Sequence, residues 1–169
     1  FIDEAGSTRA MTRIFARSPR GERSPDAVPR NRGNVLTMLG ALSSTGMTAM
    51  MTVEGATTKE VFDAFVEHVL LPKLEPGDIV VLDNLGAHRS THAEELLHAR
   101  GVWLKRLPPY SPDLNPIELA WSKLKEILRS SKARTVEALE IAIRDAMNAI
   151  TADDALAWIG HCGYEITAQ

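Results

Sequence analysis

Residues 78–83 read Asp-Ile-Val-Val-Leu-Asp and form the most apolar strand that the chain predicts. Four consecutive apolar residues after the turn pair Pro76-Gly77 are typical of a strand that is buried on both faces. Asp83 then falls at the carboxyl end of this strand. Ligands in sheet-based folds tend to gather beyond such strand ends, so Asp83 is a candidate functional residue.

Strand and helix patterns alternate on both sides of this segment. A capping box of Thr57 and Glu60 begins a helix that Pro72 ends, and the turn at residues 43–46 joins two apolar runs into an antiparallel hairpin. This order predicts an α/β fold, in which a mixed sheet with antiparallel first strands is flanked by helices. The expected strands cover residues 1–3, 12–16, 34–42, 47–53, 78–83 and 102–107, and the expected helices cover about 57–72, 90–99, 116–129, 136–150 and 151–160.

The length and composition favour a single domain over residues 1–169, with a helical C-terminal cover at about 135–160. A chain of 169 residues with 44% hydrophobic content can bury one core. Its single cysteine, Cys162, excludes an internal disulfide, and the lack of an apolar run near 18 residues argues against secretion or a membrane partner. We therefore expect a cytoplasmic protein. The chain opens at Phe1 without an initiator Met, so the natural product is expected to continue upstream.

A loop at about residues 7–33 is basic, although the whole chain carries a net charge of −3. It holds seven arginines against two acidic residues. Guanidinium groups suit phosphate oxygens, which makes the loop a candidate DNA contact; a solvated, poorly ordered loop is the alternative. The arginines are Arg9, Arg13, Arg17, Arg20, Arg23, Arg30 and Arg32.

Three carboxylates stand where folding alone gives little reason for them. If the strands that carry Asp3 and Asp83 are neighbours, these two groups repel each other unless a cation neutralises them. A hard divalent ion such as Mg²⁺ fits such oxygen ligands. Glu118 is the third, at the start of a helix with Asn115 as the expected N-cap.

Each of these carboxylates also has a plainer explanation. Asp3 could be solvated at the chain start, and Asp83 could begin a turn with Asn84. Glu118 occupies the third helical position, where a capping-box glutamate belongs.

Three motifs resemble those of the DDE endonuclease domain in bacterial insertion-sequence transposases of the insertion sequence 630 group, relatives of the mariner elements. They are Phe-Ile-Asp-Glu-Ala-Gly at 1–6, Val-Leu-Asp-Asn-Leu-Gly-Ala-His at 81–88 and Leu-Pro-Pro-Tyr-Ser-Pro-Asp-Leu-Asn-Pro-Ile-Glu at 107–118. Thirty-four residues separate Asp83 from Glu118, the spacing that this family leads one to expect. The resemblance implies a ribonuclease H-like fold, with Asp3, Asp83 and Glu118 as catalytic ligands of two Mg²⁺ ions, for which Mn²⁺ can substitute.

The same resemblance implies a reaction and its partners. Water cuts double-stranded DNA at the element ends, and the freed 3′-hydroxyl then attacks target DNA, with one ion activating the attacking oxygen and the other stabilising the leaving oxygen. A homodimer on paired ends, at the nucleoid of a bacterial cell, is the expected assembly. Nothing in residues 1–169 resembles the upstream helix-turn-helix that reads terminal repeats in this family.

Two residues near Asp83 are candidates for supporting roles. Asn84 is expected to orient the Asp83 carboxylate or a water molecule, and His88 is expected to touch phosphate. An exposed histidine at a helix start is the plainer account of His88. A zinc site shared with His92 is a remote alternative, because no further zinc ligand pattern is present.

Three more residues are candidates for DNA contacts. Lys125 and Arg129 lie seven and eleven positions after Glu118 and so share its helical face, where they could meet the DNA backbone or simply be solvated. Tyr110 could stack on a displaced base or pack against the neighbouring prolines.

Two other functions compete with the transposase domain. A catalytically inactive DNA-binding or assembly remnant of a transposase is one, although all three carboxylates are present at the expected spacing. A phosphatase with Asp3 as nucleophile is the other, and it leaves the proline-rich motif before Glu118 unexplained. No glycine-rich phosphate loop that ends in Lys-Ser or Lys-Thr occurs.

Overall fold

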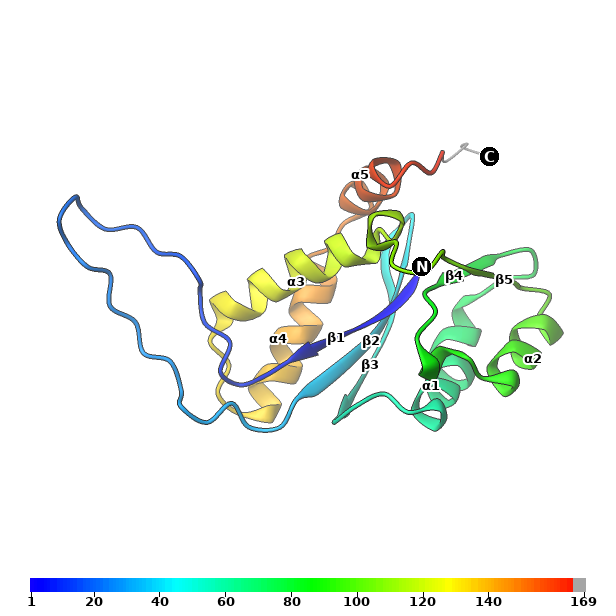
Figure 1. Ribbon diagram of the computed structural model, residues 1–169, viewed down its shortest axis with the longest axis horizontal. Helices are drawn as coiled ribbons and strands as arrows, with labels where there is room; N and C mark the ends of the chain where they lie inside the picture. Colours follow the sequence, from blue (N-terminus) through cyan, green and yellow to red (C-terminus); the bar gives the residue numbers. More distant parts are fainter. Residues whose placement is uncertain (166–169) are drawn as a thin grey trace.

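A computed structural model describes residues 1–165. In this part of the chain one five-stranded sheet has helices on both faces (Figure 1). The strands are β1 (Ile2–Ser7), β2 (Leu36–Ser43), β3 (Gly46–Glu54), β4 (Ile79–Leu82) and β5 (Trp103–Arg106). The α-helices are α1 (Lys59–Phe65), α2 (Thr91–Ala99), α3 (Ile117–Ser131), α4 (Val136–Asn148) and α5 (Ala152–His161).

The sheet is mixed and runs in the order β3-β2-β1-β4-β5. β1, β2 and β3 form an antiparallel meander, while β4 lies parallel to both β1 and β5. The expected α/β class with antiparallel first strands is therefore confirmed. β1 pairs antiparallel with β2 on one side and parallel with β4 on the other. Its first residue, Ile2, lies opposite Leu82, the carboxyl end of β4.

Two hydrophobic cores hold the helices against the sheet. On one face, α3, α4 and α5 bury Trp121, Leu124 and Ile143 against β1 and β2. On the other face, α1 and α2 pack on β1, β2 and β4. Phe65 of α1 and Leu97 of α2 are buried in this core. Among the described residues no helix is both long enough and apolar enough to cross a bilayer.

Two predicted strands differ from the structure. β1 continues to Ser7 instead of ending at Asp3, because every residue from Ile2 to Ser7 pairs with β2. The expected strand at 12–16 is wrong, since these residues lie in an exposed loop with no neighbouring strand to pair with.

The helix predicted to reach Pro72 is also not a uniform α-helix. It continues after α1 as a π-helical turn, η1 (Val66–Leu70), and a 3₁₀ turn, η2 (Leu71–Lys73). Proline has no N–H, and its ring clashes with the carbonyl four residues earlier, so regular α-helical bonding cannot pass through this point.

The arginine-rich loop leaves the body of the molecule between β1 and β2 as a long arm, which we call the basic arm (residues 8–35; Figure 1). Contacts near its two ends tie it to α3 and to the turn after α3. The Arg13 Nε donates to Ser130 Oγ at 3.3 Å, and Lys132 pairs with Asp26 at 2.7 Å. The Arg134 guanidinium also donates to two carbonyls at the base of the arm. The arm therefore begins at the C-terminal end of α3.

Candidate active site

Asp3 and Asp83 lie side by side at the edge where β1 meets β4. Ile2 of β1 pairs with Leu82, the last residue of β4, in the parallel register, so Asp3 and Asp83 are the residues that directly follow this pair. The strands that carry Asp3 and precede Asp83 are therefore neighbours in the sheet, as was required for the two carboxylates to repel each other.

Glu118 reaches the same place from the first turn of α3. Its backbone N–H donates to the Asn115 carbonyl, but its side chain makes no hydrogen bond within the described residues, so it is not the reciprocal partner of a capping box. The expected N-cap role of Asn115 is wrong: the N-cap residue is Pro116, and no side chain caps the helix. The Asn115 side chain is instead buried, and its Oδ1 has no partner among the described residues.

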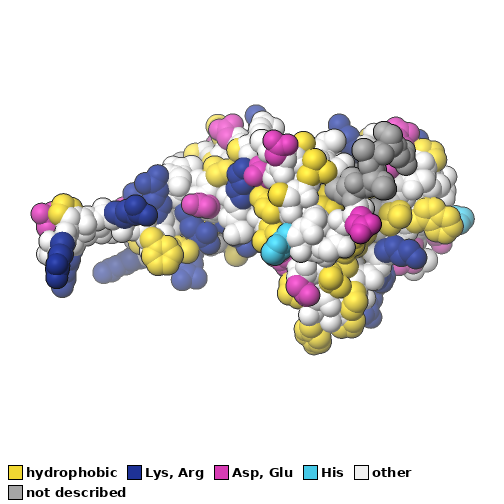
Figure 2. All heavy atoms as spheres, turned by 90° about the horizontal axis from the view of Figure 1, so that it is seen from above, with side chains coloured by type: hydrophobic (Ala, Val, Ile, Leu, Met, Phe, Trp, Pro, Cys, Tyr) yellow, Lys and Arg dark blue, Asp and Glu magenta, His cyan; other side chains and the backbone are white. Residues whose placement is uncertain are grey.

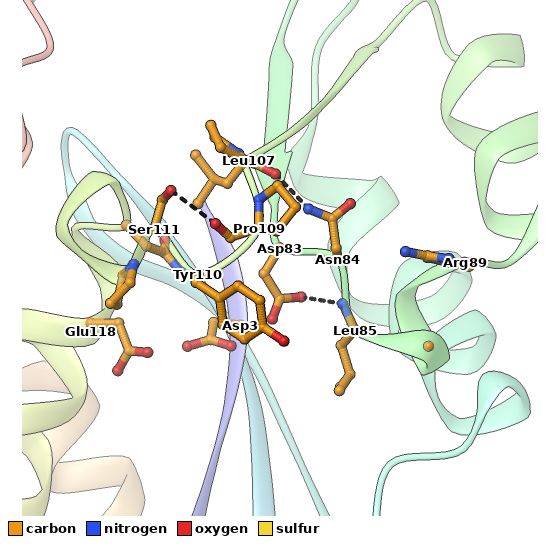
Figure 3. A pocket seen from close by; sticks show the side chains of 14 residues that line it. Asp3, Asp83, Asn84, Leu85, Arg89, Leu107, Pro109, Tyr110, Ser111 and Glu118 are labelled. Carbon is orange, nitrogen blue, oxygen red and sulfur yellow. Dashed lines mark hydrogen bonds between the residues drawn. The ribbon is translucent and has the colours of Figure 1, made fainter.

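The proline-rich segment between β5 and α3 is held in place from two sides. The Asn84 side chain donates to the Leu107 carbonyl at 2.5 Å, so it anchors this segment and makes no hydrogen bond to Asp83. The Tyr164 hydroxyl donates to the Leu114 carbonyl at 2.8 Å. Tyr110 stands fully exposed in front of the site with a positive φ of 56°, a backbone conformation that costs energy in a residue other than glycine (Figure 3).

The three carboxylates line one pocket of about 550 Å³ (Figure 3). In that view the Asp3 carboxylate lies between those of Asp83 and Glu118. The exposed guanidinium-bearing residue Arg89 also lines this pocket, and it has no acidic partner among the described residues. The pocket thus combines three carboxyl groups with one guanidinium group on its wall.

Burial and charge make Asp3 an unusual carboxyl group. Burial first, and then the nearby charges of Glu118 and Asp83, raise its pKa to about 7. The indole N–H of Trp121 donates to Asp3 Oδ2 at 3.1 Å and leaves Oδ1 without that donor. Trp121 lies one turn after Glu118, so the helix that carries one carboxylate also orients another.

Asp83 is held from the opposite face of the sheet. Its Oδ1 accepts from the Leu85 backbone N–H at 2.9 Å and from His88 Nδ1 at 2.6 Å, and the His88 hydrogen bond lowers the pKa of Asp83. His88 Nε2 lies 2.8 Å from Glu4 Oε2. The histidine is 1% exposed and both of its ring nitrogens are occupied.

These contacts correct two expectations for His88. A phosphate cannot reach its ring, because the ring is buried between two carboxylates, and for the same reason it is not an exposed residue at a helix start. A zinc site with His92 is also inconsistent with the structure, since His92 is half-exposed and faces Glu67 at 3.7 Å.

Except for Tyr110, which lines the pocket, the candidate DNA contacts lie outside it. Lys125 and Arg129 are partly exposed on α3 and form no ion pair within the described residues. Beyond them, the arginine side chains of the basic arm form a row of basic groups (Figure 2). Of the seven arginines of the arm, the first four after β1 are Arg9, Arg13, Arg17 and Arg20, and Arg13 contacts the end of α3 that is remote from Glu118.

Glu4 and Trp121 are contributors that the sequence patterns did not single out for the site. Glu4 follows Asp3 directly and Trp121 follows Glu118 by one helical turn, so proximity to a candidate ligand was the available signal. Their partners lie 84 and 118 residues away in the chain. No local pattern could identify those pairings.

The donor set fits a divalent cation. Burial and the negative charges of Glu118 and Asp83 oppose the ionisation of Asp3. A divalent cation in the pocket would favour the ionised form, because it attracts the carboxylates. The side chains as they stand do not converge: across residues 1–165 no three His, Cys, Asp or Glu side chains are grouped closely enough to hold an ion together. The exposed Glu118 side chain is the member free to rotate.

The fold and the acidic pocket together define a class of protein: ribonuclease H-like domains with one acidic residue on each of two adjacent strands and a third on a helix. Within that class, the sequence model of the DDE superfamily endonuclease family matches residues 1–140, and the chain belongs to this family.

Similar proteins agree with this assignment. The Tcb1 transposase of Caenorhabditis briggsae is 29% identical over 108 residues, which cover 62% of this chain and 40% of that protein. The Mos1 transposase paired-end complex with left transposon end has a TM-score of 0.77 at 15% identity, over 95% of this chain and 51% of that one. The Mos1 mariner paired end complex with Mn has a TM-score of 0.74 at 14% identity, with the same coverage. The chain thus spans about half or less of the length of these proteins, and the structural likeness establishes the ribonuclease H-like fold.

Proposed function

We propose that this chain is the catalytic domain of a transposase, which cuts the ends of a mobile element and joins the freed 3′-hydroxyl to target DNA. The observation that carries the proposal is that Asp3, Asp83 and Glu118 line one pocket in a chain of the DDE family. Transposases at 27–29% identity and a Mos1 complex with a transposon end support the reaction class and the DNA partner.

Asp3, Asp83 and Glu118 would hold two divalent ions, Mg²⁺ with Mn²⁺ as a substitute. The Mos1 complexes with Mn and with Mg support this choice of metal. Bound ions would supply activation of the attacking oxygen and stabilisation of the leaving oxygen in an in-line phosphoryl transfer. Asp3 and Asp83 contribute from fixed positions on the sheet, and Glu118 approaches by a change of side-chain rotamer.

Cationic side chains suggest a path for the DNA backbone. Arg89 on the pocket wall would meet the phosphate next to the reacting one, and Lys125 and Arg129 extend from Glu118 along one face of α3. From Glu118 to Ser130 is about 18 Å along the helix axis, or roughly five base pairs of duplex. The basic arm would therefore contact DNA several base pairs away from the cut. Tyr110, exposed at the pocket mouth, is positioned to stack on a displaced base.

The remaining parts of the proposal concern the whole protein. Terminal repeats and target DNA are the proposed substrates, a homodimer on paired ends is the proposed assembly, and the bacterial nucleoid is the proposed location. A DNA-reading segment outside residues 1–169 is proposed to select the element ends.

Cleavage of DNA by the Asp83→Asn variant tests the function. We expect the wild-type chain to nick supercoiled plasmid with Mg²⁺ or Mn²⁺ and not with chelator, and the variant to lose at least about 100-fold in rate, since several kcal/mol of transition-state stabilisation depend on the ions. Glu95→Gln, an exposed acidic residue of α2 outside the pocket, is the control and should cut normally.

Gel electrophoresis of nicked and intact plasmid measures the rates. DNA binding without metal-dependent cleavage by the wild-type chain would instead identify an inactive remnant. Equal cleavage by the wild type and Asp83→Asn would contradict the assignment of the site.

A further inference from the structure

Three side chains in contact, Glu4, His88 and Asp83, run from β1 to the end of β4, and the histidine between the two partly exposed carboxylates is buried. His88 lies in the 3₁₀ turn η3 (Gly86–His88), and its side chain is fully buried. Its two nitrogens face carboxylate oxygens at 2.8 Å and 2.6 Å. The ring also packs against Phe62, with centroids 4.7 Å apart. We call this unit the acid–imidazole clamp.

The clamp occupies both nitrogens of the imidazole ring. Each nitrogen lies at hydrogen-bond distance from a carboxylate oxygen, and an ionised carboxylate only accepts hydrogen bonds, so a protonated ring nitrogen is the donor in such a contact. Burial opposes the charged ring, but the hydrogen bonds from it to Asp83 and Glu4 raise the pKa of His88 to about 9. The two flanking carboxylates therefore favour the protonated ring over the neutral one.

The turn around His88 is held by a second cation. The Arg106 guanidinium at the end of β5 donates to the His88 carbonyl at 3.0 Å and pairs with Glu94 of α2 at 2.6 Å. The backbone of the turn is therefore tied to β5 and to α2, while the His88 ring is tied to β1. These restraints leave the imidazole little freedom to move.

The clamp determines which Asp83 oxygen can face the pocket. The Oδ1 atom is occupied by His88 Nδ1 and by the Leu85 N–H, so Oδ2 is left for a ligand. Asp3 shows the same arrangement from the other face of the sheet, with Trp121 on its Oδ2. Each aspartate thus presents one oxygen and has the other held by a buried donor.

We propose that His88 is a positioning residue that, with Glu4 as its anchor, locks the Asp83 carboxylate so that a single oxygen is presented to a divalent cation. This inference rests on the proposed function, because it takes Asp83 as a metal ligand. Glu4 is then the outer acid of the clamp and does not bind the ion. Residues that hold a metal ligand in this way typically contribute about 10-fold to 100-fold to metal affinity.

A matched pair of substitutions separates positioning from packing. In His88→Asn the amide nitrogen is bonded to Cγ, as Nδ1 is in histidine, so a donor to Asp83 is kept. In His88→Gln the amide nitrogen lies one bond further out, as Nε2 does, so the donor to Glu4 is kept and the one to Asp83 is lost. Both variants remove the same ring from the same buried site.

Mn²⁺ titration, with free Mn²⁺ measured by electron paramagnetic resonance, is the first measurement. We expect His88→Asn to bind within about 3-fold of wild type and His88→Gln to bind about 10-fold to 100-fold more weakly. Urea unfolding of both variants shows whether their stabilities match. Equal Mn²⁺ affinities in the two variants would overturn the positioning role.

Proton NMR of the metal-free chain tests the clamp by itself. We expect a buried histidine whose ring N–H signals exchange slowly with solvent. Asp83→Asn should move the Nδ1–H signal and Glu4→Gln the Nε2–H signal. Ring N–H signals that neither substitution moves would overturn the clamp. A wild-type chain with both signals but no Mn²⁺ binding would contradict the proposed function and the positioning role while leaving the clamp in place.

Discussion

Gly40 lies directly opposite Asp3 on the neighbouring strand β2, and its missing side chain makes room for Trp121. A Cβ atom on Gly40 would come within 2.6 Å of the far end of the Trp121 ring. That ring is 2% exposed and donates its N–H to Asp3, so it has no free space to retreat into. A glycine in the middle of a strand is thus explained by the geometry of a candidate ligand.

Gly40→Ala tests this packing. We expect the substitution to lower the free energy of unfolding by about 1–3 kcal/mol, because overpacking displaces the indole. Gly160→Ala is the matched control: Gly160 lies in α5, and a Cβ atom added there would have no neighbour within 4 Å, so alanine should stabilise the chain by roughly 0.5–1 kcal/mol. Urea unfolding measures both, and equal effects of the two substitutions would show that Trp121 is not constrained.

Asp3→Asn tests the electrostatics of the pocket in the metal-free chain. The folded-state pKa of Asp3 is raised from 3.8 to about 7, so its ionisation destabilises the fold as pH rises through that range. A pKa that differs by one between the folded and unfolded states corresponds to roughly 1.4 kcal/mol. The variant should therefore match wild type below pH 4 and be more stable by a few kcal/mol at pH 8.

Thermal or urea unfolding at pH 4, 6 and 8 without metal measures this difference. Added Mg²⁺ should then stabilise wild type more than Asp3→Asn. A pH-independent difference between the two proteins would contradict the raised pKa.

At the scale of elements, α5 is attached to α3 through one residue. Asp154 completes a capping box with Thr151 at the start of α5 and pairs with Lys123 of α3 at 2.5 Å. The helix that supplies Glu118 is thereby braced by the C-terminal cover. The Asp154 carboxylate thus both caps α5 and joins α5 to α3.

Asp154→Ala should lower the stability by about 1 kcal/mol, the usual cost of a lost helix cap. The Lys123 hydrogen bond first, and then the cap, lower the pKa of Asp154 to about 2, so its contribution is present above pH 3.8 and is lost as pH falls through 2. Asp153→Ala, an exposed neighbour in the same turn, is the control and should change the stability by less than about 0.5 kcal/mol. Urea unfolding at pH 7 measures both, and equal losses would exclude the cap.

At the scale of the whole molecule, charge is segregated. The basic arm extends from one end of α3, while the acidic pocket lies at the other end (Figures 1 and 2). The net charge of −3 hides this separation. A DNA duplex that reaches both ends would meet an excess of arginines along the arm and a group of carboxylates at the site of reaction.

The double variant Arg17→Gln, Arg20→Gln tests the arm as a DNA contact. Its affinity for duplex DNA should fall, and the slope of log affinity against log salt should become shallower by about 0.9 for each phosphate that the arm no longer neutralises. Both side chains are exposed, so the melting temperature should not change. Lys59→Gln with Lys73→Gln removes two exposed charges outside the arm as a control. Fluorescence anisotropy at several salt concentrations measures the slopes, and identical slopes for both double variants would exclude the arm.

The element order was predictable from the sequence because it depends on short-range patterns. The apolar run before Asp83, the hairpin turn before β3 and the capping box of α5 each lie within a few residues, and the backbone follows such local preferences. The extent of β1 was not predictable in this way, because strand length is decided by pairing with β2, 29 or more residues away.

The candidate site, too, was predictable only in those features that depend on residues close together in the sequence. The sequence by itself determined which acidic residues stand at strand ends and at a helix start, and the resemblance of its motifs joined them as one set. Only the tertiary structure decided that Asp83 is clamped through His88 to Glu4 and that Trp121 reaches Asp3 across Gly40. The physical reason is that burial and hydrogen-bond partners arise where distant segments pack together, and only the folded chain brings those segments into contact.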